Sequence, residues 1–149
     1  MGLLGSAFYS IHPLVPMERV VANINLDMVG RSDGTAIGIA AGCDELFDRA
    51  SEFGKRCGIS VVPDKHPTWR LVYFIDSYHF ARMGVPFIEF ATEMHKDYHQ
   101  VTDTADLIRY DELNRIIDVA FELTNYYARG APRPTFKRPA WFLTPDSPQ

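Results

Sequence analysis

The segment VVANINLDMV, residues 20–29, decides the fold class of this 149-residue chain. Nearly every position is apolar, with only Asn and Asp interspersed, which is typical of a central strand buried on both faces. The turn sequence GRSDG follows at residues 30–34, and TAIGIAAG at residues 35–42 predicts a second short strand. VPFIEF at residues 85–90 predicts another apolar strand.

Segments whose apolar residues recur at helical spacing flank and separate these strands. Residues 3–11 predict a helix that ends at His12-Pro13, because proline disfavours the α conformation in the preceding residue. Residues 44–57 predict an amphipathic helix that Gly58 ends, and residues 78–83 predict a short helix that Asp76-Ser77 would cap. A long helix is predicted for residues 111–129. Strands alternating with helices predict an α/β fold, an αβα layered mixed sheet with helices on both faces.

The two longer helices are each expected to bury one stripe of side chains. The predicted stripes are Leu46, Phe47, Ala50 and Phe53 in the first, and Leu113, Ile116, Ile117, Ala120, Phe121 and Thr124 in the second. Cys43 and Cys57 would lie at opposite ends of the first helix, too far apart to form a disulfide.

Composition excludes several classes of protein. With 46% hydrophobic and 23% charged residues, the chain has the make-up of a globular domain. Fifteen Lys and Arg against 19 Asp and Glu give a net charge of -4 without a run of like charges, which argues against a nucleic-acid partner. The sequence contains no apolar run of about 18 residues, so no membrane span is expected, and no signal peptide is recognised at its start. These features do not assign the protein to a cellular compartment.

In two segments the apolar residues do not recur with the period of a helix or a strand. Residues 64–74 carry His66, Trp69, Arg70 and Tyr73, and we interpret them as a loop over one end of the sheet. Five of the ten prolines lie in residues 132–148, which predicts an extended C-terminal tail that is packed on the surface or disordered. The expected organisation is therefore one folded unit, residues 1–130, and a tail, residues 131–149.

Ligands of layered α/β sheets bind outside the carboxyl ends of the strands, which selects Asp27 and the loop of residues 92–104. Asp27 would need a partner or a metal ion to offset its desolvation, or it is a strand-end carboxylate that caps a turn. The loop sequence HKDYHQVTDT, residues 95–104, is rich in side chains that ligate metal ions and orient ligands. Alternatively it is a hydrogen-bonded surface loop in which Asp103 or Thr104 serves as a helix cap.

A serine hydrolase is excluded. Ser77 and His79 are two positions apart, so they do not face each other on a helix, and no G-x-S-x-G sequence occurs.

Four segments together resemble consecutive signatures of one family, the zinc-dependent M28 metallopeptidases. These are mostly aminopeptidases with two metal ions in the active site. The segments are GLLGS with YSIHPLVP, VVANINLDMVGR, DSYHFARMGVPFIEF and HKDYHQVTDTADLIRYDEL, in that order and spacing. The resemblance implies that residues 1–130 are the C-terminal half of a peptidase catalytic domain and that the substrate is a peptide.

The resemblance also implies roles for individual residues. It makes Asp27 a terminal ligand to one zinc ion, His99 a terminal ligand to the other, and Tyr98 an oxyanion donor beside the substrate carbonyl. Asp76 and Asp103 match positions whose side chains contact the metal ligands and not the metal ions. From their position, residues 66–74 and 92–94 are candidates to line a pocket for the first side chain of the substrate.

One departure from the family pattern concerns the start of the sequence. In the family a Glu-Glu pair stands just before the residue that precedes GLLGS, and here Met1 occupies that intervening position. The general-base Glu, the adjoining Glu ligand, the bridging Asp and the first His ligand of the family are therefore expected outside this sequence. One terminal ligand per metal ion remains.

Such a site is expected to be incomplete. Catalytic zinc takes about three protein ligands, and two divalent ions about 3.5 Å apart repel each other by roughly 20 kcal/mol at an effective dielectric constant of about 20. We therefore expect the chain to be inactive by itself. Two alternatives stay open: a non-catalytic binding protein of the same fold, with a homo-oligomer covering exposed sheet surface, and a single-metal site formed by Asp27, His99 and either His95 or Asp97.

Overall fold

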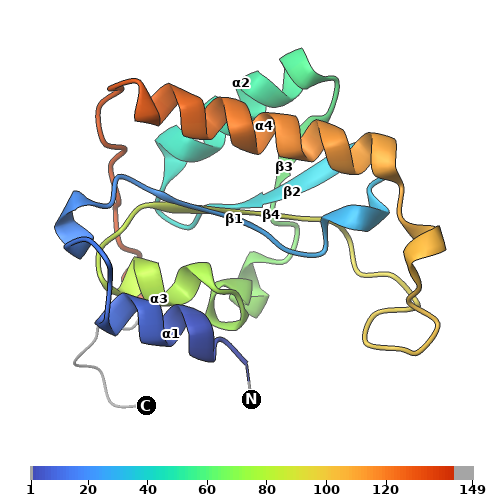
Figure 1. The fold of residues 1–149 in the computed structure, drawn as a ribbon, viewed down its shortest axis with the longest axis horizontal. Coiled ribbons are helices and arrows are strands. Elements are labelled where there is room, and N and C mark those ends of the chain that lie inside the picture. The colour runs from blue at the N-terminus through green and yellow to red at the C-terminus, as the bar shows by residue number, and fades with distance from the viewer. Residues whose placement is uncertain (1, 143–149) are drawn as a thin grey trace.

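The computed structural model describes residues 2–142, and they form a mixed sheet between two layers of helices (Figure 1). Four strands, in the spatial order β1-β4-β2-β3, make up the sheet of this part of the chain. The strands are β1 (Asn23–Leu26), β2 (Thr35–Ile39), β3 (Ser60–Pro63) and β4 (Phe87–Ala91). Strand β4 pairs parallel with β1 and antiparallel with β2, and β2 pairs parallel with β3. The predicted αβα mixed-sheet architecture is confirmed.

The helices cover both faces of the sheet, as Figure 1 shows. Helices α2 (Asp44–Cys57) and α4 (Tyr110–Ala128) pack together on one face, and α1 (Leu4–Ile11) and α3 (Ser77–Arg82) lie on the other. Short 3-10 turns connect these elements, at Met17–Arg19, Val29–Arg31, Pro67–Trp69, Leu71–Phe74 and Ala105–Leu107.

Strand β4, and not the strand in residues 20–29, is the buried centre of the described sheet. Phe87, Ile88 and Phe90 have no exposed surface. Strand β1 covers only four of the ten predicted residues, pairs with β4 alone among the described strands, and leaves Leu26 37% exposed. The prediction of a central strand was wrong because an apolar run records how hydrophobic a segment is, whereas the number of neighbouring strands depends on distant parts of the chain.

Helix α2 spans the predicted residues, and Gly58 ends it with a positive φ of 74°. Leu46, Ala50 and Phe53 are buried as expected. In α4 the buried residues are Ile116, Val119, Ala120 and Leu123. Ile117, Phe121 and Thr124 were wrongly placed inside, since the predicted stripe is wider than the surface that this helix packs against, and all three are exposed.

Helix α3 begins at Ser77, after Asp76. The Asp76 side chain makes no capping hydrogen bond, and the Ser77 hydroxyl donates to Glu89 in the adjacent strand instead. The predicted side-chain cap was therefore wrong, because a tertiary hydrogen bond took the place of the local one.

Residues 131–139 form neither helix nor strand and pass the start of α2, where the amide of Thr135 donates to Glu45, and a turn at residues 140–142 leads into the core. Phe142 is 4% exposed, and the amide of Lys137 donates to the carbonyl of Gly42 at 2.8 Å. The rest of the predicted tail, residues 143–149, lies outside the described residues. Cys43 and Cys57 are both free within residues 2–142, as expected. None of the helices in this range combines the length and the hydropathy needed to cross a membrane.

Candidate functional site

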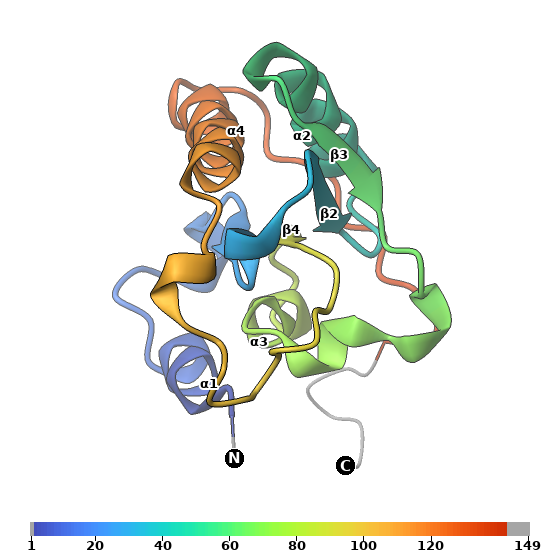
Figure 2. The same ribbon diagram turned by 90° about the vertical axis from the view of Figure 1, so that its right-hand side faces the viewer.

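The carboxyl ends of β1 and β4 lie at the same end of the sheet because the two strands are parallel. The amide of Asp27 donates to the carbonyl of Phe90 at 3.0 Å, which extends this pairing one residue beyond β1. Figure 2 looks onto this end of the sheet, where the segment after β4, drawn in yellow and orange, passes below the turn that follows β1. The two candidate segments therefore meet, as the sequence predicts.

A cavity of about 500 Å³ opens between these segments, and we call it the polar cavity. It brings together four of the five predicted site residues: Asp27, Tyr98, His99 and Asp103. The fifth, Asp76, is exposed at the start of α3 and does not line this cavity. The remaining lining residues are Met28, Gly30, Arg31, His95, Thr104, Ala105 and Ile108.

A smaller cavity of about 210 Å³, which we call the inner cavity, adjoins the polar cavity. Asp27, Met28 and Tyr98 line both. The inner cavity extends between β2 and β4 on one side and the segments 64–75 and 92–94 on the other. Residues from the segments 66–74 and 92–94 therefore line one cavity, and Asp27 and Tyr98 lie at its junction with the polar cavity.

Two residues of the site hold the backbone in the left-handed region. Met28 and His99 both have φ near 56°, a conformation that costs a non-glycine residue about 1 kcal/mol or more and that recurs at functional sites. The hydroxyl of Thr92 donates a short hydrogen bond to the carbonyl of Met28. The rings of Tyr98 and His99 stack, with centroids 3.9 Å apart and planes 20° from parallel. A tertiary hydrogen bond thus fixes Met28 on one side of the polar cavity, and a local ring stack orients His99 on the other.

Arg31 ties the loop after β4 to the turn after β1. Its guanidinium lies 2.7 Å from the carboxylate of Asp103 and 3.3 Å from that of Asp97. The hydrogen bond from Thr102 is the largest cause of the lowered pKa of Asp97, and Arg31 lowers it further. Asp97 is therefore ionised and already bonded, and Asp103 contacts Arg31.

The donors of the proposed single-metal site are not assembled. His95 lines the polar cavity with Asp27 and His99, and its Nδ1 is buried without a hydrogen-bond partner in the described structure. Within residues 2–142, however, no three His, Cys, Asp or Glu side chains are placed to hold one metal ion together. The carboxylate of Asp27 and the imidazole of His99 are both of the right chemical type to ligate zinc.

Sequence reasoning missed Glu89, a fully buried carboxylate in β4. Its Oε2 accepts hydrogen bonds from Asn25 at 2.8 Å and from Ser77 at 3.2 Å, while Oε1 has no partner among the described residues. Burial raises the pKa of Glu89 to about 7; the two hydrogen bonds lower it, and the charges of Asp27 and Asp76 add to the increase. The available signal was a single charged residue in the apolar sequence VPFIEF.

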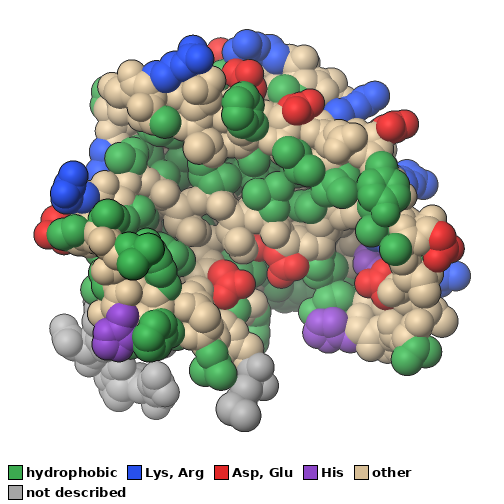
Figure 3. All heavy atoms as spheres, in the orientation of Figure 1, with side chains coloured by type: hydrophobic (Ala, Val, Ile, Leu, Met, Phe, Trp, Pro, Cys, Tyr) green, Lys and Arg blue, Asp and Glu red, His purple; other side chains and the backbone are tan. Residues whose placement is uncertain are grey.

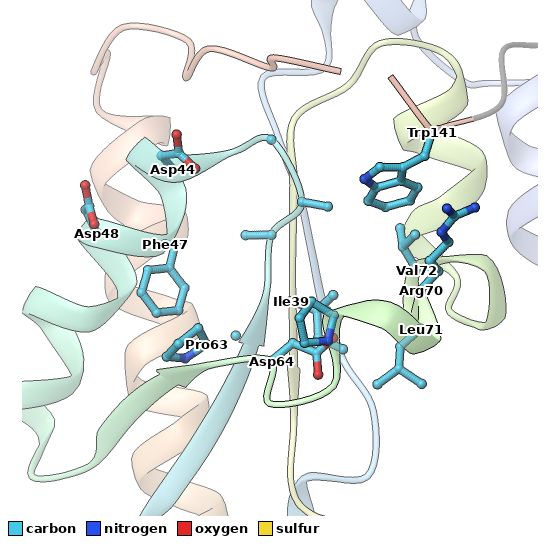
Figure 4. A pocket seen from close by; sticks show the side chains of 15 residues that line it. Ile39, Asp44, Phe47, Asp48, Pro63, Asp64, Arg70, Leu71, Val72 and Trp141 are labelled. Carbon is cyan, nitrogen blue, oxygen red and sulfur yellow. The ribbon is translucent and has the colours of Figure 1, made fainter. Parts of the chain in front are cut away.

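A third cavity, of about 410 Å³, lies on the other side of the segment 64–71. Figure 4 shows Phe47 and Pro63 on one wall and Arg70 and Trp141 on the other. It shares Ile39, Asp64 and Leu71 with the inner cavity, but none of the five predicted site residues lines it. We therefore place the candidate site in the polar and inner cavities.

Comparison with solved structures identifies the fold. An aminopeptidase from Aneurinibacillus sp. strain AM-1 matches 92% of this chain with a TM-score of 0.65 and 22% identity. BSAP, a zinc aminopeptidase from Bacillus subtilis, matches 97% with a TM-score of 0.65 and 23% identity. This chain covers 32% of the first structure and 36% of the second, about a third of each. None of the curated proteins matches this sequence.

The family model of peptidase family M28 matches residues 1–124. That range contains both strands whose carboxyl ends form the polar cavity and all five predicted site residues. The chain therefore belongs to peptidase family M28.

Proposed function

We propose that this chain forms part of the active site of a zinc-dependent aminopeptidase that hydrolyses peptide bonds. Asp27 and His99 each supply one terminal ligand, to two different zinc ions. The observation that carries the proposal is that Asp27, Tyr98 and His99, from two distant segments, line one cavity at the carboxyl ends of β1 and β4. Membership of family M28 and the fold shared with a zinc aminopeptidase support it.

The donor set fits part of a zinc centre. A carboxylate oxygen and an imidazole nitrogen are both ordinary zinc ligands, and a catalytic zinc ion takes about three protein ligands. Two donors in the polar cavity fall short of that number. We infer that the remaining ligands and the general base belong to polypeptide outside residues 2–142, and that this chain by itself does not hydrolyse peptides.

The chain's own residues then bind and orient the substrate. Zinc, when bound, supplies a Lewis acid for the scissile carbonyl. Tyr98 is half-buried between the two cavities, and its hydroxyl would donate a hydrogen bond to the carbonyl oxygen as negative charge develops there. The inner cavity would receive the side chain that precedes the scissile bond.

Isothermal titration of zinc into the purified chain, together with an assay on leucine p-nitroanilide, tests this proposal. We expect weak zinc binding that His99→Ala and Asp27→Asn each reduce further, and no turnover. His12→Ala is the matched control, since His12 is exposed and lies outside both cavities. Zinc binding that neither site variant changes would contradict the ligand assignment, and tight binding of two ions with turnover would contradict the incomplete site.

A second candidate function, a non-catalytic binding protein, is favoured by one surface. Large exposed apolar side chains gather on α1 and the segment after it: Leu4, Phe8, Ile11, Leu14 and Val15. Figure 3 shows hydrophobic side chains spread over the face on which α1, β1 and α4 are seen. We propose that a second copy of the chain covers this face when the rest of the catalytic domain does not. A monodisperse, zinc-free dimer without activity would favour this function over the first.

A further inference from the structure

The inner cavity combines apolar walls with an acidic lining. Its walls are aliphatic and aromatic side chains from β2 and from the segment before α3: Ile37, Ile39, Leu71, Phe74 and Ile75. Four carboxylates also line it, those of Asp27, Asp64, Glu89 and Glu93. No lysine or arginine is among its lining residues in the described part of the chain.

The four carboxylates differ in their surroundings. Glu93 is exposed and pairs with Lys65 at 2.5 Å, so its charge is already compensated at the rim. Glu89 is among the residues that line the cavity, and it has no exposed surface. Its two hydrogen bonds, from Asn25 and Ser77, come from neutral donors and both reach Oε2.

The remaining oxygen of Glu89 is therefore a buried acceptor in need of a donor. A buried polar atom without a partner costs about 1–3 kcal/mol, and more when the group is charged. An apolar ligand filling this cavity would leave that cost in place. A ligand with a terminal cation would remove it and would also be attracted by the carboxylates nearer the opening.

We propose that the inner cavity binds a lysine-type side chain, with its aliphatic stem against the apolar walls and its terminal ammonium on the free Oε1 of Glu89. Glu89 is then a specificity-determining residue. The inference rests on the proposed function, because it assigns the inner cavity to the substrate and names the substrate class as peptides with a cationic first side chain.

The dimensions of the cavity agree with this assignment. Its 210 Å³ equals the liquid volume of roughly seven water molecules, at about 30 Å³ each, which exceeds the need of the five heavy atoms of a lysine side chain. Lysine side chains bury their methylene stem along apolar surfaces while the charged end finds a polar partner. The junction at Asp27, Met28 and Tyr98 places the rest of the ligand in the polar cavity.

The test compares two ligands that share an aliphatic stem, L-lysinamide and L-norleucinamide. Binding to the full 149-residue chain is measured by isothermal titration calorimetry without zinc, at a pH above the pKa of Glu89, which is about 7. We expect lysinamide to bind about tenfold more tightly, the size of effect that one charge-assisted hydrogen bond supplies. Equal binding of the two ligands, or no binding of lysinamide, would overturn the inference without any variant being needed.

Two carboxylate-to-amide variants then locate the effect. Glu89→Gln keeps the size of the side chain and should abolish the preference for lysinamide. Glu93→Gln, the matched control at the rim, should retain most of it. A preference that survives Glu89→Gln would contradict the assignment to that residue.

The outcome is separable from that of the zinc experiment. His99→Ala should leave the lysinamide preference intact while it weakens zinc binding. A preference for lysinamide without any zinc binding would support the assignment of the inner cavity and contradict the assignment of Asp27 and His99 as zinc ligands. Zinc binding without a preference for lysinamide would support the zinc ligands and contradict the assignment of the inner cavity.

Discussion

At the scale of single residues, the carboxyl group of Glu89 couples folding to pH. Burial raises its pKa from 4.5 to about 7 in the folded chain. The folded state therefore holds the proton more tightly than the unfolded state between these values, and stability falls as the pH rises through them. Above the folded pKa the loss is complete, and a shift of this size corresponds to about 3 kcal/mol.

We predict that Glu89→Gln removes this dependence. Relative to the unsubstituted chain, the variant should become more stable as the pH rises from about 4.5 to about 7. Urea unfolding at a series of pH values measures both free energies of unfolding. Parallel pH profiles for the two proteins would show that the folded pKa of Glu89 is not raised.

The other residue-scale features of the site could not be found by pattern. Met28 and His99 take left-handed backbone conformations that neither side chain favours. Contacts with distant or neighbouring groups hold them there, the Thr92 hydroxyl on the Met28 carbonyl and the Tyr98 ring on the His99 ring. The contact of Thr92 with Met28 exists only after the two segments have come together.

At the scale of elements, the docking of residues 131–142 depends on Gly42. Its φ is 74°, and a Cβ atom added there would lie 2.1 Å from the carbonyl oxygen of Lys137. The close approach permits the hydrogen bond from the Lys137 amide to the Gly42 carbonyl. This segment carries Trp141 and Phe142, which pack against the aromatic cluster around Tyr73.

We predict that Gly42→Ala destabilises the protein by about 2–4 kcal/mol, since it adds a steric clash to backbone strain. Gly34→Ala is the matched control, because Gly34 also has a positive φ, of 100°, but no heavy atom within 4 Å of the added Cβ. That control should cost only about 1 kcal/mol. Chemical unfolding compares the two, and equal losses would mean that the contact with Lys137 is unimportant.

At the scale of the whole molecule, the exposed apolar face around α1 favours assembly with a second copy of the chain. Phe8 is 65% exposed, and β1 offers an edge that no described strand pairs. Exposed apolar patches and open strand edges both favour association.

We predict that the chain self-associates and that Phe8→Glu shifts it towards monomer, because the variant places a charge in the contact. Light scattering over a range of protein concentrations measures the effect. Val101→Glu is the control, since Val101 is 98% exposed and belongs to the loop between β4 and α4, which Figure 1 shows apart from α1. A mass unchanged by Phe8→Glu would exclude this face as the contact.

The sequence by itself determined the alternation of strands and helices, the bounds of α2, the family, and the segments that carry Asp27, Tyr98 and His99. These follow from local spacing, capping glycine and motif order, which need no knowledge of distant contacts. The tertiary structure alone decided that β1 lies at the edge and β4 at the centre, that Asp76 stays outside the polar cavity, and that Glu89 is buried with one free oxygen. Burial and hydrogen-bond satisfaction depend on which remote segments pack against a residue, and a linear pattern does not contain that information.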